Sequence, residues 1–505
     1  MSTAIEGITD SPAPTWSDRV RKPLEAVLTG DGLKAKVLRG GAWLGTGSFS
    51  EQVIRFGRNM LLTRLLAPEA FGTMAIVLSA CSVVQTIMDV GVKEALIQNP
   101  RGSEEEYAGA AWWMAFGRAL SFCAVLWSLS PWIARFYGNL QLGPLFRVAA
   151  VGVLLEGALS SHAYVAIREM KFRKWAMINH GGAIVGVVIT IVLSLLLRNV
   201  WALVLGYCSE SFGRLVLSYV ICPHLPPRRP PVAAIRELLK FSRRAFGLSL
   251  LNLIFARTDI FVLAKMFPPA QLGLYTMAIY LVQTPASFIM NLLGQTMLPM
   301  YARIQRDGVR TNRVLVQVTA VLMAAGAPAA IFVCFCAPSL LRLLYGPRYS
   351  AAAGPLVAAS FVALFNLLNA QITTVFYAKG LPQLHRRCVM VTAITMMILI
   401  LPSVKLFGLV GGQLACLVAI VAGYAFQTLR VRTVTGLDLM PYAKGCLLGL
   451  SVSSIVGITC LVTRSFGVFT RPLPNILFGL LGCLGAYAFS LLFLRRGSSS
   501  GLAEP

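Results

Sequence analysis

Charged side chains are scarce in this sequence, and acidic ones are the scarcest. Only 13% of the 505 residues are charged and 56% are hydrophobic, whereas soluble domains carry about 25% charged residues. The 20 Asp and Glu residues stand against 45 Lys and Arg residues, a net charge of +25. A nucleic-acid-binding protein needs a charged surface that this composition does not supply. The composition therefore excludes a soluble fold and predicts an all-α polytopic membrane protein with basic residues between apolar helices.

The sequence also lacks the usual marks of an enzyme or a metalloprotein. Eleven cysteines are scattered through it without a Cys-x-x-Cys pair, which argues against disulfides and zinc. No loop is large enough for a glycosyltransferase or polymerase site, and no Gly-rich loop ends in Lys-Ser/Thr, as ATP binding would require. Residues 1–40 contain no apolar stretch, so they are not a cleavable signal. We expect no enzyme activity, no catalytic residues, no metal and no cofactor.

About fourteen windows are long enough to cross a membrane, since each crossing needs about 20 apolar residues. The first and seventh are weak because they contain charges. With the N-terminus placed in the cytoplasm, thirty Lys and Arg residues lie in inner segments and ten in outer loops, which predicts cytoplasmic N- and C-termini. The windows lie near 41–63, 70–92, 108–129, 146–167, 175–197, 200–221, 243–264, 271–298, 315–343, 352–377, 388–406, 408–429, 443–463 and 474–494.

The two halves of the chain share a motif. The segment from Arg64 to Gly72 matches the segment from Lys265 to Gly273 in its base, proline and glycine, at an offset of 201 residues. Six spans separate the copies, which predicts parallel repeats related by an axis along the membrane normal, as in alternating-access transporters. The predicted parts are a cytoplasmic basic segment (1–40), a six-helix N-lobe (41–222), a cytoplasmic linker (223–242), a six-helix C-lobe (243–432), and two extra helices with a short cytoplasmic tail (433–505).

Charged residues inside the spans point to a wet interior. Each ionised side chain at the centre of a bilayer costs at least about 2.5–3.5 kcal/mol, so these residues must face protein or water rather than lipid. Polar side chains also form stripes on the first, second, seventh and eighth spans, which predicts a central aqueous cavity lined by those four. The charged residues are Glu51, Arg55, Arg58, Asp89, Arg118, Glu156, Glu210, Arg214, Arg257 and Asp259.

Sequence spacing suggests how some of these charges pair. Glu210 and Arg214 are four residues apart on a helix, and so are Glu51 and Arg55, which favours ion pairs within each helix. We expect Arg118 and Glu156 to pair between the third and fourth spans. Arg58 is then left over as an unpaired base in the cavity. Arg257 is turned about 200° from Asp259 on a helix, so the two should not face one cavity unless the helix is unwound. His162, at an outer or middle depth, is expected to be a packed histidine.

The motif with its surroundings, NMLLTRLLAPEAFGTMAIV and its echo VLAKMFPPAQLGLYTMAIY, resembles the bacterial polysaccharide flippases. These are the Wzx/PST-type members of the multidrug/oligosaccharidyl-lipid/polysaccharide exporter superfamily. The resemblance covers residues 40–440. It implies a V-shaped pair of lobes, as in the multidrug members, in the bacterial inner membrane. It also implies translocation of an undecaprenyl-diphosphate-linked oligosaccharide for surface or exopolysaccharide biosynthesis.

The same resemblance suggests where the diphosphate binds. Related flippases use cationic cavity residues on the first and the seventh or eighth helices, and Arg55, Arg58 and Arg257 match those positions. This sequence departs from that pattern because its eighth span carries amides and no base. Arginine suits a diphosphate because its guanidinium makes bidentate contacts with phosphate.

Other polar residues in the spans are candidates for binding the sugar and for coupling transport to an ion gradient. Five could hydrogen-bond sugar hydroxyls, and two acids are candidates for proton or sodium coupling. We expect an anionic polyprenyl-linked glycolipid as substrate, membrane lipids as surroundings, and a polysaccharide polymerase and chain-length machinery as possible partners. The sugar candidates are Tyr280, Asn291, Gln295, Asn366 and Asn369, and the coupling candidates are Asp89 and Asp259.

Two other functions compete with this one. A multidrug or cation antiporter of the same fold would favour an acidic, aromatic cavity, whereas the first span here carries two arginines. A membrane polysaccharide polymerase or ligase would need a large external loop with catalytic Arg or His residues, which the sequence does not show.

Overall fold

The computed structural model describes residues 33–88, 91–227, 229–242, 246–465, 474, 476–485 and 487. The predictions for residues 1–32 and for Asp89 therefore lie outside the described residues. Within the described ranges the chain forms α-helices and one short 3-10 helix, with no β-strand among them. The predicted all-α class is confirmed.

The helices follow one another with short connections. The first half contains α2 (Leu33–Leu65), α3 (Pro68–Ile87), α4 (Val92–Gln98), α5 (Glu105–Phe136), α6 (Leu142–Gly157), α7 (His162–Arg168), α8 (Phe172–Leu197) and α9 (Val200–Ile221). The second half contains α10 (Val232–Ser242), α11 (Phe246–Met266), α12 (Pro269–Arg303), α13 (Gly308–Leu344), η1 (Pro347–Ala352), α14 (Ala353–Ala378), α15 (Pro382–Thr435) and α16 (Leu439–Ser465).

The chain is a multi-pass membrane protein. Nine helices of the described residues are long and apolar enough to cross a membrane, or ten if the bent pair α6 and α7 forms one span. The helices α2 and α11 are outside that group, and they hold the charges that weaken the first and seventh windows. With its 54 residues, α15 covers two predicted windows and is broken between them at Gly408, since one crossing needs about 20 residues. The total of fourteen spans and the V shape stay predictions.

Two predicted boundaries differ from the structure. The first helix begins at Leu33 rather than near residue 41, because basic residues such as Lys34 and Lys36 are good helix formers and extend a helix beyond its apolar window. Between the eleventh and twelfth windows the structure has one non-helical residue, Gly408, with φ 59° and ψ −135°. Only glycine adopts such a backbone conformation readily, and the chain turns back there, so that Gly423 packs against Thr392 and Cys416 against Met396.

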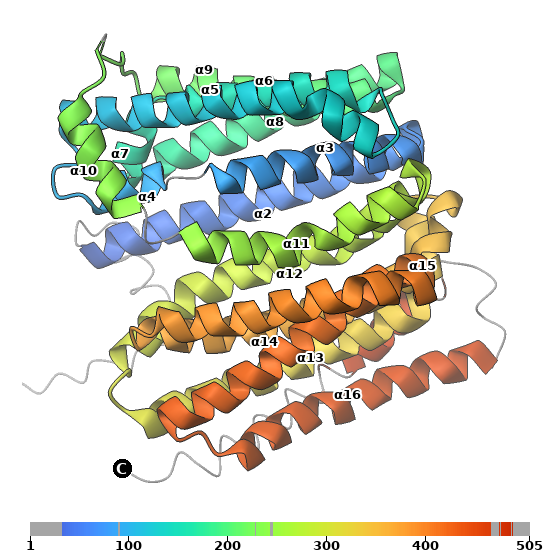
Figure 1. The fold of residues 1–505 in the computed structure, drawn as a ribbon. Helices are drawn as coiled ribbons and strands as arrows, with labels where there is room; N and C mark the ends of the chain where they lie inside the picture. The colour runs from blue at the N-terminus through green and yellow to red at the C-terminus, as the bar shows by residue number, and fades with distance from the viewer. Residues whose placement is uncertain are drawn as a thin grey trace, which may run out of the picture.

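The helices pack in two groups (Figure 1). Within the N-terminal group, α2 packs on α8, α8 on α9, and α5 on α6; within the C-terminal group, α12 packs on α14, α14 on α15, and α13 on α16. Contacts between the groups run through α3, which packs against α11 and α12, and through α2, which packs against α12. The cavity helices named below therefore lie where the two groups meet.

The repeated motif forms a reciprocal contact between α3 and α12. A Cβ atom added to Gly72 would lie 1.8 Å from the Pro269 carbonyl oxygen, and one added to Gly273 would lie 1.8 Å from the Pro68 carbonyl oxygen. The glycines thus allow the two helices to touch backbone to backbone, which is the close packing that the motif predicts. Reciprocal contacts of this kind are what a two-fold axis between the repeats produces.

The other end of the molecule holds the short helices α4, α7 and α10, on the left in Figure 1. The predicted linker 223–242 is therefore partly helical. The helix α10 packs against α5 and α4, burying Ala234 and Leu238. Upstream, Trp113 donates a hydrogen bond from Nε1 to the Pro227 carbonyl at 2.9 Å, so the connection between the groups lies against the N-terminal group.

Candidate functional site

Three cavities follow one another from the contact between the two groups of helices into the C-terminal group. The arginine cavity, about 330 Å³, is lined by α2, α3, α8, α9, α11 and α12. The middle cavity, about 620 Å³, shares Arg55, Arg257, Asp259 and Tyr280 with it and extends to α14 and α15. The amide cavity, about 420 Å³, shares Asn366 with the middle cavity and is lined by further amides and hydroxyls. Neighbouring cavities thus share lining residues, and polar side chains occur in the wall of each.

The four helices expected to line a central cavity are α2, α3, α11 and α12, and all four line the arginine cavity. The helix α3 does so with a face other than the polar one. It contributes the largely apolar side chains Phe71, Met74 and Leu78 rather than its polar stripe. In that stripe, Ser82 donates a hydrogen bond to the Ser79 carbonyl and Thr86 donates one to the Ser82 carbonyl, both at 2.8 Å. Since these hydroxyls bond their own helix, the stripe does not indicate a cavity face.

All three candidate diphosphate residues line the arginine cavity, but carboxylates hold only Arg55. Its Nη1 and Nη2 donate to the two carboxylate oxygens of Glu210 at 3.1 and 2.5 Å, and its Nε donates to Glu51 at 2.9 Å. The predicted Glu51–Arg55 pair is therefore present. The bidentate contact with Glu210 links α2 to α9.

The ion pairs continue through the N-terminal group. Glu210 also accepts a hydrogen bond from Arg214 at 2.5 Å, which confirms the predicted pair. Arg214 bonds Glu156 at 3.1 Å, the acid that sequence reasoning pairs with Arg118. The remaining Glu51 oxygen lies 2.8 Å from His180 Nδ1. This chain of alternating charges lets the N-terminal group keep ionised residues away from lipid.

Arg58 and Arg257 differ from Arg55 because neither forms an ion pair with any described residue. Arg58 donates from Nε and Nη2 to the Asn59 side-chain oxygen at 3.2 and 3.1 Å, a neutral partner. Arg257 comes from α11, in the other group, and lines the arginine and middle cavities. Among the described residues, each group thus contributes a guanidinium that forms no ion pair with a carboxylate.

Arg257 and Asp259 line the same two cavities although α11 is helical throughout. The expectation that they could not share a cavity without unwinding is wrong, because the cavities extend over more than one face of α11.

Asp259 is the centre of a buried hydrogen-bonded triad in the C-terminal group. Tyr275 donates its hydroxyl to Asp259 Oδ2 at 2.7 Å, and Gln413 donates to the Tyr275 oxygen at 2.8 Å and to Asp259 at 3.3 Å. Asp259 is 6% exposed. A Cβ atom on Gly412 would lie 2.9 Å from the Tyr275 hydroxyl oxygen, so this glycine lets the hydroxyl approach α15. Sequence reasoning missed Tyr275 and Gln413, because no local spacing links them to Asp259.

The candidate sugar residues are placed differently from one another. Tyr280 lines the arginine and middle cavities, and Asn366 lines the middle and amide cavities. Asn369 lines the amide cavity, while its Nδ2 donates to the Phe365 carbonyl at 3.0 Å. Asn291 and Gln295 lie on the exposed second half of α12, outside the lining of all three cavities.

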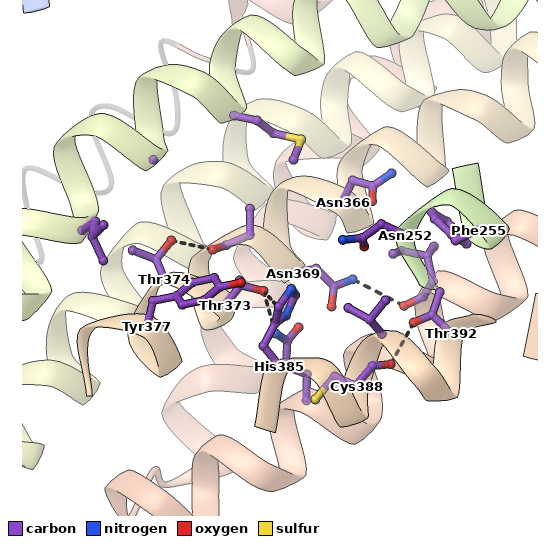
Figure 2. A pocket seen from close by; sticks show the side chains of 17 residues that line it. Asn252, Phe255, Asn366, Asn369, Thr373, Thr374, Tyr377, His385, Cys388 and Thr392 are labelled. Atoms are coloured by element: carbon purple, nitrogen blue, oxygen red, sulfur yellow. Dashed lines mark hydrogen bonds between the residues drawn. The ribbon is translucent and has the colours of Figure 1, made fainter. Parts of the chain in front are cut away.

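The amide cavity also contains residues that sequence reasoning did not select. Figure 2 shows His385 beside Thr373, with 3.2 Å between His385 Nδ1 and Thr373 Oγ1. Gln427 donates to the same hydroxyl at 2.8 Å. Asn252 lines the cavity from α11. The cavity is therefore suited to a neutral ligand rich in hydroxyl groups.

Comparison with known proteins agrees with this picture. A family model described as "Polysaccharide biosynthesis protein" matches residues 61–354. The chain is 25% identical over 288 residues to the succinoglycan biosynthesis transport protein ExoT of Rhizobium meliloti (strain 1021), a match that covers 55% of this chain and only 56% of that protein. It is 19% identical over 394 residues to the lipopolysaccharide biosynthesis protein WzxC of Escherichia coli (strain K12), covering 78% of each.

Among solved structures, the lipid II flippase MurJ in an inward closed conformation is similar to this chain. The TM-score is 0.72, the identity is 14%, and the match covers 89% of this chain and 99% of that one. At this identity the likeness establishes the fold alone.

Proposed function

Because the chain belongs to the polysaccharide biosynthesis protein family, we propose that it is a flippase for a polyprenyl-diphosphate-linked oligosaccharide. It moves one polysaccharide repeat unit from the inner to the outer leaflet of the bacterial inner membrane by alternating access. The observation that carries the proposal is the pair Arg58 and Arg257, one from each group of helices, which both line the arginine cavity and form no ion pair with a described carboxylate.

A diphosphate needs cationic partners because it cannot enter hydrocarbon. Arg58 and Arg257 have guanidinium donors to offer, and arginine binds phosphate oxygens in pairs. Arg55 is occupied by Glu210 and Glu51, so its role is to hold α2 in position. A diphosphate held by both groups would link their movements.

The oligosaccharide occupies the middle and amide cavities. Tyr280 and Asn366 line the path between the cavities, and the amide cavity adds further hydroxyl and amide groups. Asn291 and Gln295, on the exposed half of α12, meet the sugar on its way in. The lipid tail stays in the membrane throughout.

The proposed orientation of the protein in the membrane rests on the distribution of basic residues, which predicts that both termini lie in the cytoplasm. The Pro68–Pro269 contact then lies at the periplasmic end, and α4, α7 and α10 lie at the cytoplasmic end. In this orientation the groups touch on the periplasmic side, and the exposed second half of α12 faces the cytoplasmic entry.

Transport against a gradient needs an energy source. We propose that Asp259 couples transport to a proton or sodium gradient. This carboxylate lies within the membrane region and borders the arginine and middle cavities, so a proton or sodium ion bound there would alter the charge that the diphosphate meets. Asp89 is the second candidate. The polymerase and chain-length machinery would receive the flipped unit.

A gene deletion tests the proposal. We expect surface polysaccharide to disappear and lipid-linked repeat units to accumulate on the cytoplasmic leaflet, where a sugar label applied from outside does not reach them. A polymerase or ligase would instead leave units accessible from outside, and a drug antiporter would alter drug sensitivity with polysaccharide unchanged. Either result contradicts the proposal, and a plasmid with the wild-type gene is the control.

A further inference from the structure

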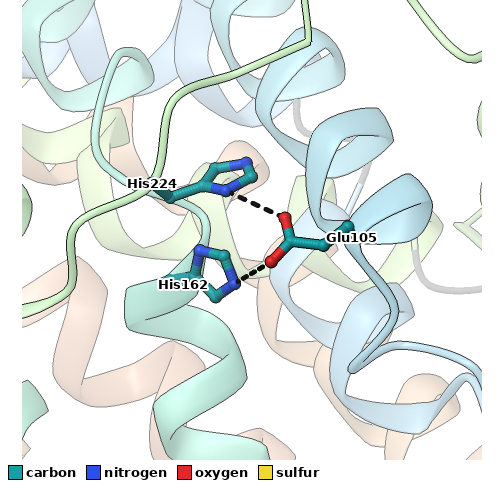
Figure 3. Close-up of side chains that lie close together, drawn as sticks. All are labelled: Glu105, His162 and His224. Atoms are coloured by element: carbon teal, nitrogen blue, oxygen red, sulfur yellow. Dashed lines mark ion pairs between the residues drawn. The ribbon is translucent and has the colours of Figure 1, made fainter.

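Two histidines and a glutamate converge at the end of the molecule opposite the Pro68–Pro269 contact. Glu105 begins α5, His162 begins α7, and His224 lies in the connection after α9. The Glu105 carboxylate lies between the two rings (Figure 3), with Oε1 3.3 Å from His162 Nε2 and Oε2 3.2 Å from His224 Nδ1. The chain bends by 56° between α6 and α7, which brings His162 to the connection; the membrane depth expected for it stays a prediction.

The spacing of these atoms fits a metal ion. One donor atom from each residue lies within 4.8 Å of the other two. A tetrahedral zinc ion with bonds of about 2.0–2.1 Å places its ligand atoms about 3.3 Å apart. Each Glu105 oxygen lies at about that distance from one histidine nitrogen, Oε1 from His162 and Oε2 from His224, so both rings and the carboxylate can reach one ion. Two imidazoles and one carboxylate are a common zinc ligand set that leaves the fourth position to water.

Of the three candidate ligands, His224 is buried and Glu105 is exposed, so the site is both held in place and open to solvent. The His224 side chain is 5% exposed, and its Nε2 has no hydrogen-bond partner among the described residues. The Glu105 side chain is 75% exposed, so both an ion and its water ligand have access from solvent.

We propose that Glu105, His162 and His224 form a zinc-binding site that fastens the connection between the two halves of the chain to the N-terminal group. The site joins three segments that are distant in sequence. Neighbouring contacts already hold the same region, since Ser160 donates its hydroxyl to the Cys222 carbonyl at 2.6 Å. Zinc would add a link at the point where the chain leaves α9. The proposal does not depend on what the protein transports.

Zinc binding to the purified full chain tests the site. The protein is prepared without a polyhistidine tag, treated with a chelator and dialysed against Zn²⁺, and the bound metal is measured by mass spectrometry. We expect one Zn²⁺ per chain, with affinity at least about tenfold lower in Glu105→Gln, since even changes in residues that only orient metal ligands weaken binding by about 10–100-fold. Glu105 is exposed, so this variant should fold.

Controls separate this site from adventitious binding. Glu106→Gln changes an exposed acid next in sequence, and His385→Gln removes a histidine far from the cluster; both should bind zinc as the wild type does. His162→Gln and His224→Gln should lose affinity, and Co²⁺ should give the visible absorption of a tetrahedral site in the wild type and the two control variants but not in these two. Zinc binding that is absent in the folded wild type, or equal in Glu105→Gln, overturns the proposal.

Discussion

Three arginines line one cavity, but their surroundings give them different roles. Arg55 is fixed by Glu210 and Glu51, whereas Arg58 and Arg257 form no ion pair with the described residues. Removing one partner of a buried ion pair leaves a charge without compensation, and this is strongly destabilising. A mutation at Arg55 therefore tests folding, while mutations at the other two test binding.

We predict that Arg58→Ala and Arg257→Ala abolish most polysaccharide export while the protein stays folded in the membrane. Each loses charge-assisted hydrogen bonds of about 1.5–3 kcal/mol, or about a tenfold to hundredfold loss of substrate affinity. Arg55→Ala should instead lower the stability of the purified protein by about 3 kcal/mol. Export is measured in cells and unfolding in detergent. Wild-type export in both Arg58→Ala and Arg257→Ala would rule out the diphosphate site.

Asp259 gives a second prediction at the same scale. Asp259→Asn keeps an oxygen that accepts the Tyr275 hydrogen bond but removes the charge, so flipping in proteoliposomes should lose its dependence on an imposed proton or sodium gradient. Tyr275→Phe is the control: it keeps the carboxylate, so gradient dependence should remain, with stability lowered by about 1–3 kcal/mol. An unchanged gradient dependence in Asp259→Asn removes this residue from coupling.

Local spacing explains which of these contacts sequence reasoning found. Glu210 and Arg214 are neighbours on one helix face, so their pairing was predictable. The Arg55–Glu210 contact and the Asp259–Gln413 contact join residues 155 and 154 positions apart, and nothing local marks such partners.

At the scale of helices, the pairing of α3 with α12 rests on two glycines. Both lie in the repeated motif, and each meets a carbonyl of the other helix. The motif also carries the resemblance to polysaccharide flippases, which the family match now confirms. The same local sequence therefore produces both the repeat and the contact between its copies.

Gly273→Ala and Gly72→Ala should each disrupt this contact, because the added methyl group overlaps a backbone carbonyl that cannot rotate away. Overpacking of this kind costs about 1–3 kcal/mol, and export should fall because the two groups of helices no longer meet correctly. Thermal unfolding and export are measured together.

Two glycines on the same set of helices provide the controls. A Cβ atom at Gly57 of α2 or Gly294 of α12 would meet nothing within 4 Å. Because Gly294 lines the amide cavity, its variant is a control for thermal unfolding and not for export. Alanine at either position should be neutral or stabilising by up to about 1 kcal/mol, because it favours helix more than glycine does. Equal effects at all four positions would show that the contact has no special role.

At the scale of the whole molecule, the connection between the two groups is an ordered element. The helix α10 contacts α5 through Glu237, whose carboxylate accepts hydrogen bonds from the Tyr107 hydroxyl and from Asn99. The Tyr107 hydrogen bond is the main cause that lowers the pKa of Glu237. The ionised form is therefore favoured in the docked state.

This pKa shift predicts that α10 docking depends on pH. Because the folded-state pKa is lowered, the stabilisation is complete above the usual glutamate pKa of about 4.3 and is lost as the pH falls through the lowered value. Amide hydrogen exchange in α10, corrected for the intrinsic rate, should accelerate in acid. Glu237→Gln should show faster exchange at neutral pH and little further response to acid. Exchange that is the same in both proteins at both pH values would contradict this role.

The sequence by itself determined the membrane class, most helix positions, the repeat and the ion pairs within one helix, because apolar windows, loop charges and helical spacing act over short distances. Only the tertiary structure decided which buried charges lack a partner, that α3 presents its apolar face to the cavity, and that Glu105, His162 and His224 converge. These features depend on side chains from distant segments, and their positions are set by the packing of whole helices.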